Sequence, residues 1–299
     1  MTMYAAHPAP KVVGLDAALG GVRGTLATVE RYRTQPGTNT QGGDPAHHAS
    51  PDLLLRHTVN YLLAADIAAT VPVPGPLLDV GSGVAVFSAW LARRLERALC
   101  VVDHDPRVLQ LARRSFADLT THDDLAEAPP APVVTAMEVL EHVRYADQAA
   151  FVRALFDRVV PGGVLICSTP DECGYLGGWS GYAPHVGTLD AGSLRTLLRT
   201  ATGAPVDVWR IDGPAFRLRT AQRLGEPIVN RVWSALQATL PGLTNRVVGT
   251  VGRRRRVRVD VFDPGPPDDA YTVTAADECD AGTGMLAVVR RPERQHPTV

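Results

Sequence analysis

Short apolar runs alternate through the middle of the chain with stretches in which apolar residues recur every three or four positions. Such runs, bounded by Gly, Pro and polar residues, are typical of buried strands, and the wider spacing indicates helices. The alternation predicts an α/β fold in which a mostly parallel sheet carries helices on both faces. The expected strands are Leu77–Val80, Cys100–Val102, a run ending near Met137, Val164–Thr169, Val206–Ile211 and Met285–Arg290, and the expected helices include Pro106–Phe116, Asp147–Val160 and Asp190–Thr202.

Residues 1–70 are expected to form an N-terminal helical segment. The apolar spacing in Leu15–Tyr32 predicts a helix that is broken at Gly20 and Gly21. A second helix is expected to begin at Ser50 and Pro51, because serine caps helix N-termini and proline is favoured at the first helical position. Between the two helices the chain is polar and rich in Gly and Pro, which predicts a loop that ends in two histidines, His47 and His48.

Residues 213–282 form an insertion between the strand Val206–Ile211 and the last expected strand. Its Ile228–Leu240 portion is patterned as an amphipathic helix, and the four arginines 253–256 precede an alternating segment that is typical of a strand. The arginines could recognise an anionic substrate or could be a solvated edge that prevents sheet pairing. We expect residues 71–212 to be the core, 213–282 to cap the substrate, and 283–299 to supply the last core strand and a tail.

The stretch Leu77–Val80 leads directly into a glycine turn, Gly81-Ser82-Gly83, and then into helical spacing. A strand, a glycine turn and a helix together present backbone N–H groups to a ligand, and glycine lets the main chain approach that ligand closely. Asp79 lies at the carboxyl end of this strand, where α/β sheets bind their ligands. This stretch therefore predicts the centre of a binding site.

A second carboxylate follows the next strand, since Cys100–Val102 ends at Asp103, 24 residues after Asp79. A βαβ unit places an acid at about this distance against ribose hydroxyls. The alternative is that both acids are merely polar ends of strands. The fingerprint for dinucleotides would require glycine at position 86, where the chain has Val86.

The segments around both acids resemble the S-adenosylmethionine (SAM) site of class I methyltransferases. Val133–Val143 resembles the fourth-strand motif, and Pro161–Pro170 the fifth strand, of a branch that includes ubiquinone-biosynthesis O-methyltransferases and natural-product methyltransferases. The resemblance covers about residues 70–212, with Ala85 where the third glycine is usual. It implies a seven-stranded, Rossmann-like sheet, and an N-terminal segment that closes over SAM as a lid.

The resemblance also implies which residues bind the cofactor. Asp123 or Asp124, together with Leu125, should lie near the adenine, and the choice between the two acids stays open. The full set expected to bind SAM is Asp79, Gly81, Ser82, Gly83, Asp103, His104, Asp123, Asp124, Leu125 and Met137.

A cluster of ionisable residues follows the fourth strand. Glu138, Glu141 and His142 would face one side if the chain turned helical there, and His185 is expected to return to the site after the fifth strand. Two carboxylates and two imidazoles suit Mg²⁺ or another divalent metal, and the pattern resembles the catalytic metal motif of small-RNA 2′-O-methyltransferases. The alternatives are a metal-free role for His142 or His185 as base or orienter, and a purely structural role. The residues expected to act in catalysis are His142, His185 and Glu138.

Three aromatic residues, Tyr175, Trp179 and Tyr182, lie in the glycine-rich stretch before His185. The resemblance places this stretch beside the methyl acceptor, where aromatic rings could stack on a ring substrate. The alternative is that they hold in place a loop that its glycines would otherwise loosen.

We therefore expect a SAM-dependent methyltransferase that acts on a hydroxyl of a small molecule, in secondary metabolism or on a quinone- or catechol-like compound. The alternatives are N-methylation of an amine and a SAM-binding protein without methyl transfer. A net charge of −1 argues against a nucleic-acid partner, and no apolar run is long enough to span a membrane. The four scattered cysteines, without a C-x-x-C pair, predict reduced thiols and a cytoplasmic location. The oligomeric state is left open.

Overall fold

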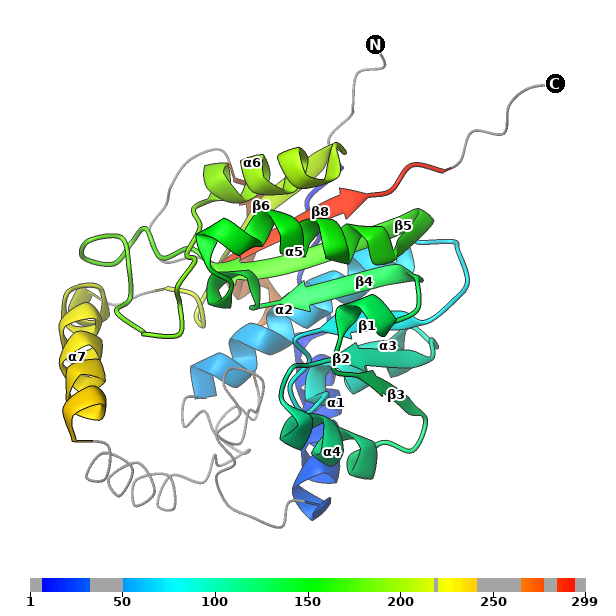
Figure 1. Ribbon diagram of the computed structural model, residues 1–299, viewed down its shortest axis with the longest axis horizontal. Coiled ribbons are helices and arrows are strands. Elements are labelled where there is room, and N and C mark those ends of the chain that lie inside the picture. Colours follow the sequence, from blue (N-terminus) through cyan, green and yellow to red (C-terminus); the bar gives the residue numbers. More distant parts are fainter. Residues whose placement is uncertain (1–6, 33–50, 218–219, 241–264, 277–283, 294–299) are drawn as a thin grey trace.

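The computed structural model describes residues 7–32, 51–217, 220–240, 265–276 and 284–293. Its centre is an eight-stranded sheet in the order β3-β2-β1-β4-β5-β8-β6-β7 (Figure 1). The α/β class is as expected, but the expectation of seven strands is wrong. The additional strand is β7, which pairs antiparallel with β6 at one edge of the sheet. Its four residues are largely exposed and form no apolar run, so the sequence carried no signal for it.

The strands run parallel from β3 to β5, and only β8 among the central strands is reversed. β8 pairs antiparallel with both β5 and β6, with Ala287 opposite Cys167 on one side and Val208 on the other. β6 therefore runs in the same direction as β5. The bounds are β1 Leu77–Val80, β2 Leu99–Val102, β3 Leu119–His122, β4 Ala131–Met137, β5 Val159–Pro170, β6 Val206–Asp212, β7 Thr272–Ala275 and β8 Gly284–Arg290.

Helices cover both faces of the sheet, because alternate strand residues enter two separate cores. Leu77 and Val133 belong to the core with α1, α2, α3 and α4, whereas Leu78 and Val134 belong to the core with α5 and α6. The two layers are visible in Figure 1. The helices are α1 Leu15–Tyr32, α2 Pro51–Ala69, α3 Val86–Arg94, α4 Pro106–Ser115, α5 Tyr145–Arg158, α6 Ala191–Thr202 and α7 Thr220–Thr239.

Helix α1 is continuous, so the expected break at Gly20 and Gly21 is wrong. Two glycines cost a helix about 1 kcal/mol each, but this helix buries a complete apolar face. Gly21 also permits close packing, because a Cβ there would lie 2.5 Å from Nε1 of Trp90. The N-terminus of α1 is capped from far away in the sequence, since the Asp268 carboxylate accepts hydrogen bonds from the N–H groups of Gly14 at 2.6 Å and Leu15 at 2.9 Å.

The insertion is described in part. Helix α7 begins at Thr220, eight residues before the expected start at Ile228, and Pro227 lies inside it. Within the described segment 265–276, a short 3₁₀ turn, η3 (Asp268–Ala270), precedes β7. The arginine run 253–256, the alternating segment after it, and the histidines His47 and His48 lie outside the described residues. The division of the chain into lid, core and cap stays a prediction.

The cysteines differ in part from expectation. Cys100 in β2 and Cys167 in β5 are buried free thiols, and burial raises their pKa values to about 11 and about 12. Cys173, three residues after β5, is disulfide-bonded, so the prediction of reduced thiols is wrong there. The cytoplasmic location, which rested on those thiols, stays a prediction.

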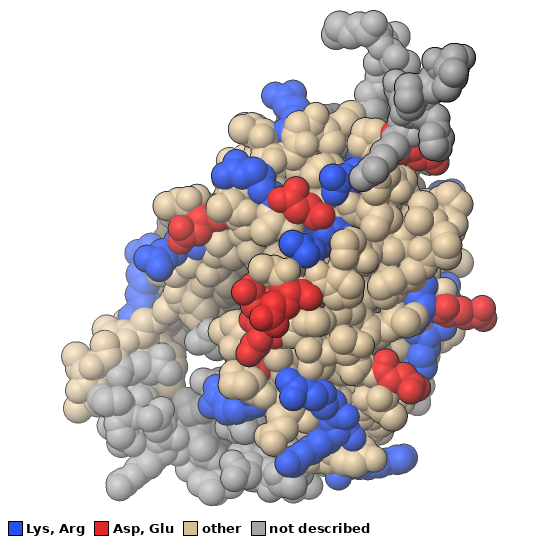
Figure 2. Space-filling view, turned by 45° about the vertical axis from the view of Figure 1, so that its right-hand side comes forward, with Lys and Arg blue, Asp and Glu red and all other residues tan. Residues whose placement is uncertain are grey.

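The surface offers two further observations. On the face in Figure 2, acidic and basic side chains lie interspersed among uncharged residues. No helix among the described residues is long and apolar enough to cross a bilayer.

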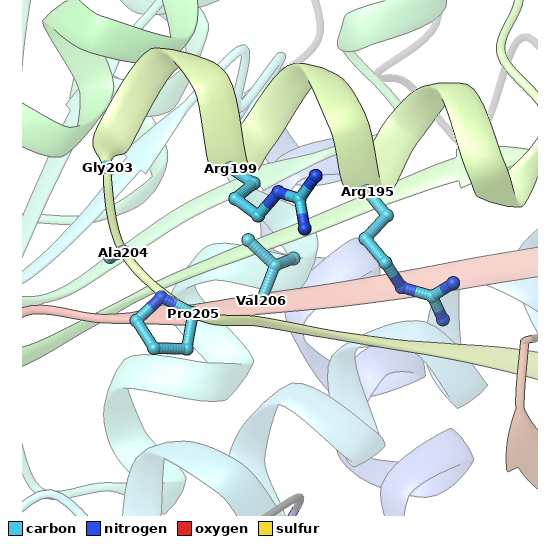
Figure 3. A pocket seen from close by; sticks show the side chains of 6 residues that line it. All are labelled: Arg195, Arg199, Gly203, Ala204, Pro205 and Val206. Atoms are coloured by element: carbon cyan, nitrogen blue, oxygen red, sulfur yellow. The ribbon is translucent and has the colours of Figure 1, made fainter. Parts of the chain in front are cut away.

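A pocket of about 420 Å³ is lined by Arg195, Arg199 and residues 203–206 (Figure 3). It lies where α6 leads into β6, at the amino ends of the parallel strands. The glycine turn predicted to bind the ligand lies at the opposite, carboxyl edge of the sheet. This pocket is therefore separate from the candidate site described next.

Candidate active site

The turn between β1 and α3 has the shape that its glycines predict. Gly81 and Gly83 have φ angles of 76° and 55°, in the left-handed region that favours glycine. A Cβ on Gly81 would also lie 2.5 Å from Cγ2 of Val139, so both backbone and space require glycine. Ala85, where a third glycine is usual in the resembling family, has a φ angle of 60°. The turn therefore keeps its left-handed form at Ala85 at the cost of a less favoured backbone conformation.

Asp103 lies directly beside this turn. Its Oδ2 accepts a hydrogen bond from the Gly83 N–H at 2.8 Å, and its Oδ1 accepts one from the Asp105 N–H at 3.0 Å. The carboxylate thus connects the glycine turn to the start of α4. His104 points outward, with 90% of its side chain exposed and Nδ1 3.6 Å from Asp103 Oδ1. The structure brings Asp103 and the turn together, as the spacing predicts.

Asp79 occupies a different environment from the one expected of a ligand-facing acid. Its side chain is fully buried and accepts hydrogen bonds from Tyr61 Oη at 2.9 Å, Thr135 Oγ1 at 2.5 Å and Ser88 Oγ. Burial raises the pKa of Asp79 to about 6, although the hydroxyl donors partly offset this. Through these hydrogen bonds Asp79 connects β1 to α2, α3 and β4, beneath the glycine turn.

The other cofactor candidates lie along the same edge of the sheet. Asp124 caps the short 3₁₀ turn η1 (Leu125–Glu127), with Oδ1 accepting from Ala126 N–H at 2.8 Å, and Leu125 is half-buried. The exposed carboxylate of Asp123 takes no part in that cap. Met137 ends β4 in the core beneath the site, and Ser82 is buried within the glycine turn.

Glu138 contacts α2 and lies outside the group that Glu141 forms with the two histidines. Glu138 has a left-handed φ angle of 56° and lies between β4 and the 3₁₀ turn η2 (Leu140–His142). Glu138 therefore does not share a helix with Glu141 and His142. Arg56 Nη2 donates to Glu138 Oε2 at 2.6 Å. Asn60 Nδ2 and Ser168 Oγ donate to Oε1 at 3.2 and 3.1 Å. These contacts occupy both oxygens of the carboxylate.

Glu141, His142 and His185 come together instead. Each offers a ligand atom, and these atoms lie within 4.8 Å of one another. The imidazole rings of His142 and His185 meet edge to face, with centroids 4.9 Å apart. Glu141 is buried and accepts a hydrogen bond from Thr169 Oγ1 at 2.9 Å. Burial, and then the nearby charge of Glu138, raises the pKa of Glu141 well above its ordinary value.

Both imidazoles are held through Nδ1. His142 Nδ1 lies 3.1 Å from the Pro184 carbonyl oxygen, and His185 Nδ1 contacts Glu172 Oε1. A carbonyl oxygen and a carboxylate can only accept hydrogen bonds, so each Nδ1 carries the proton. When the rings are neutral, Nε2 of both carries a lone pair. The pKa of His142 is lowered by burial and by the neighbouring His185, which favours the neutral ring.

Glu172 is a site residue that the sequence interpretation missed. It is 2% exposed and accepts hydrogen bonds from Ser180 N–H and Ser180 Oγ, both at 2.9 Å, besides the one from His185. Burial alone would raise its pKa, but the hydrogen bonds from His185 and Ser180 outweigh burial and lower it. A signal was available, because Glu172 follows β5 as Asp103 follows β2, at the carboxyl edge where ligands bind.

The three loop aromatics fix the loop itself. Trp179 Nε1 donates to the His185 carbonyl at 3.1 Å, and the Tyr182 ring meets the His185 ring edge-on with centroids 4.9 Å apart. Tyr175 Oη donates to Glu226 of α7 at 2.9 Å. These contacts favour the interpretation that the aromatics hold the loop, and two of them, Trp179 and Tyr182, contact His185 directly.

The residues that converge here fit a divalent metal. Glu141 offers one oxygen and each histidine one ring nitrogen, a donor set found with Zn²⁺, Mn²⁺ and Fe²⁺. Each histidine also has the Nδ1 partner that metal-bound histidines have in known sites. Glu138 is not part of this group of three.

A family model described as a methyltransferase domain matches residues 54–207, just over half of the chain. A probable SAM-dependent methyltransferase from Mycolicibacterium smegmatis is 32% identical over 246 residues, which cover 79% of this chain and 88% of that protein. A ubiquinone biosynthesis O-methyltransferase from Cereibacter sphaeroides is 37% identical over 137 residues, 42% of this chain and 54% of that protein. The chain thus spans about half the length of this ubiquinone-biosynthesis relative.

Among solved structures, a putative sarcosine dimethylglycine methyltransferase from Galdieria sulphuraria is similar to 92% of this chain and 99% of its own. Its TM-score is 0.49 and its sequence identity is 13%.

Proposed function

The chain belongs to the class I SAM-dependent methyltransferases, and from this premise we propose that it transfers the methyl group of SAM to a hydroxyl of a small molecule. The observation that carries the proposal is the pair of imidazoles, His142 and His185, whose Nε2 atoms carry lone pairs at the carboxyl edge of the sheet. A hydroxyl acceptor must lose its proton, whereas an unprotonated amine needs no base.

SAM binds along the turn that begins at Gly81. The glycines of the turn let the main chain approach the cofactor closely, Asp103 accepts hydrogen bonds from the ribose hydroxyls, and Asp123 with Leu125 lies at the adenine. Asp79 acts from beneath, by fixing the turn against α2 and α3.

In the transfer step the acceptor oxygen attacks the methyl carbon in line with the sulfur. The carbon–oxygen bond forms as the carbon–sulfur bond breaks, and the positive sulfonium becomes a neutral thioether. The hydroxyl proton passes to Nε2 of His142 or His185. Because the leaving group is good, the protein contributes mainly alignment and proton removal.

In a metal-bound form, Glu141, His142 and His185 would hold the ion, and the two histidines would then be ligands in place of acting as the base. Such a metal supplies Lewis acidity that makes a hydroxyl easier to deprotonate. Vicinal oxygens chelate a metal, so metal binding would direct the search for substrates to catechols and cis-diols.

The names of the relatives support a hydroxyl acceptor, since several are called ubiquinone biosynthesis O-methyltransferases. A secondary metabolite or a quinone- or catechol-like compound is the proposed acceptor. The contacts of Glu138 support a positioning role for that residue, toward Arg56, and the base is assigned to the histidines.

The test measures SAM binding and methyl transfer separately. Isothermal titration of SAM and of its demethylated product into EDTA-treated protein tests the cofactor site, and the absence of binding under all metal conditions would refute it. Transfer of labelled methyl groups to phenols, catechols, diols and amines then tests the acceptor class. Transfer to amines alone would replace the proposal with N-methylation, and SAM binding with no transfer would favour a protein that only binds SAM.

The histidines are tested by His142→Ala and His185→Ala, with His7→Ala as a control. His7 contacts Asp207 at the start of β6, on the opposite edge of the sheet. Loss of a general base is expected to lower kcat by about 10²- to 10⁴-fold, with SAM affinity nearly unchanged. Equal losses of affinity and turnover would exclude a catalytic role.

A further inference from the structure

We propose that Glu172 is a positioning residue for the reaction, which holds His185 in the tautomer and orientation that expose Nε2 to the acceptor. The inference rests on the proposed function, because it assigns the reacting proton to the histidine pair. It concerns a residue that neither touches the acceptor nor belongs to the set predicted from the sequence.

The position of Glu172 in the fold suits this role. It lies two residues after β5, a central strand, whereas His185 lies thirteen residues further on, at the far side of a loop. That loop contains Gly177, Gly178 and Gly181, all with left-handed φ angles. A glycine-rich backbone of this kind does not by itself fix the orientation of the His185 side chain. The Glu172 carboxylate, which lies next to a central strand, restrains the imidazole through its contact with Nδ1.

The two oxygens of the Glu172 carboxylate accept hydrogen bonds from different parts of the loop. Oε2 accepts from the Ser180 N–H, which closes the loop, and Oε1 accepts from His185 Nδ1, which fixes the ring. The Ser180 hydroxyl adds one further bond to Oε1. Ser180→Ala therefore removes one donor to Glu172, while the bond from the Ser180 N–H and the contact to His185 stay in place.

The pairing also matters for charge. When Nε2 takes the acceptor proton, the imidazole becomes a cation in a half-buried site. The Glu172 carboxylate stays ionised and lies against that cation, so the charge that appears during transfer meets an opposite charge already in place. Glu172 itself neither gains nor loses a proton in the step.

Glu172→Gln is the decisive substitution, because it removes the charge at nearly constant size. An amide nitrogen placed at Oε1 would face His185 Nδ1 and select the other tautomer, and placed at Oε2 it would face the Ser180 N–H. We expect kcat to fall about 10- to 100-fold, as for partners behind metal ligands and catalytic histidines, with KM and SAM affinity within about 3-fold of wild type. Glu172→Asp keeps the charge and is expected to recover part of kcat.

Ser180→Ala is the matched control, since it removes one donor to Glu172 and keeps the contact to His185. Its kcat is expected to stay within about 3-fold of wild type. If Ser180→Ala and Glu172→Gln lowered kcat equally, the loss would follow from the contact between Glu172 and Ser180 and not from the contact with His185, and the inference would be overturned.

A nitrogen NMR measurement on histidine-labelled protein distinguishes failure of this inference from failure of the proposed function. The His185 ring of the wild type is expected to carry its proton on Nδ1, and Glu172→Gln is expected to shift it toward Nε2. An Nε2-protonated ring in the wild type would overturn the inference, whatever the activity. The expected tautomers in a protein that transfers no methyl group would keep the positioning role and refute the proposed function.

Discussion

The carboxylate of Asp103 holds the glycine turn directly, with Oδ2 2.8 Å from the backbone nitrogen of Gly83. One side chain therefore shapes the turn and offers its remaining lone pairs to the ribose. Asp103→Ala is expected to weaken binding of SAM and of its demethylated product equally, because both carry the same ribose. We expect a loss of about 10- to 100-fold for each, from hydrogen bonds to a charged group worth about 1.5–3 kcal/mol, measured by titration calorimetry.

The control for this variant is Asp157→Asn, which removes an equal charge from the exposed face of α5. It should leave both affinities unchanged. A folded Asp103→Ala protein that bound SAM as the wild type does would place the ribose elsewhere.

The same substitution should have opposite effects at two glycines. Gly81→Ala introduces a Cβ 2.5 Å from Val139 Cγ2 at a left-handed φ, and it is expected to lower the stability by about 1–3 kcal/mol and to impair SAM binding. Gly20→Ala lies in α1 with nothing within 4 Å of the new Cβ, and it is expected to raise the stability by about 0.5–1 kcal/mol. Urea unfolding measures both, and effects of the same sign would contradict the packing described.

Asp79 should make stability depend on pH in an unusual direction. Its folded pKa of about 6 lies above its ordinary value of 3.8, so the folded state binds the proton more tightly than the unfolded state. The stability that this proton provides is complete below the lower pKa and is lost as the pH rises through the higher one. The difference corresponds to about 3 kcal/mol.

Asp79→Asn removes this titration at constant size. The stability of the variant relative to wild type is expected to rise by about 2–3 kcal/mol between about pH 4 and about pH 7. Urea unfolding at both pH values gives the two differences, in which all other titrating groups cancel. A difference that did not change with pH would mean that Asp79 titrates normally.

Metal affinity should depend on three side chains and not on four. Titration of Mn²⁺ or Zn²⁺ into EDTA-treated protein is expected to show binding that His142→Ala weakens at least 10-fold. Glu138→Gln should change it by less than about 3-fold, because Glu138 contacts Arg56, Asn60 and Ser168 and lies outside the cluster. Equal losses in both variants would restore Glu138 to the set of ligands.

Local signals in the sequence were sufficient for the core of the fold. The strand Leu77–Val80 and its glycine turn are read from neighbouring residues alone. β7 was missed because Thr272–Ala275 is short and exposed. Its pairing partner, β6, also lies about 60 residues earlier in the sequence. The continuous α1 was missed because the burial of Leu15, Leu19 and Leu26 outweighs the low helix propensity of two glycines.

The positions of site residues could be predicted from the sequence where they directly follow a strand, but not where they depend on the path of a loop. Asp103 reaches the turn because its strand pairs with β1. Spacing placed Glu138 with Glu141 and His142, but a single left-handed residue turned its carboxylate toward Arg56. The contact between Glu172 and His185 depends on the path of the twelve residues between them, which no periodicity describes.

The reversed strand β8 has a consequence for how the protein is made. In the sheet, β8 lies between β5 and β6. In the sequence, about 70 residues separate the end of β6 from the start of β8. A ribosome that adds about 5–20 residues per second needs about 4–14 s to cross that interval. Throughout this time β5 and β6 are complete and their inner edges have no strand to pair with. Until β8 is made, two strand edges that lie inside the finished sheet are therefore open to aggregation.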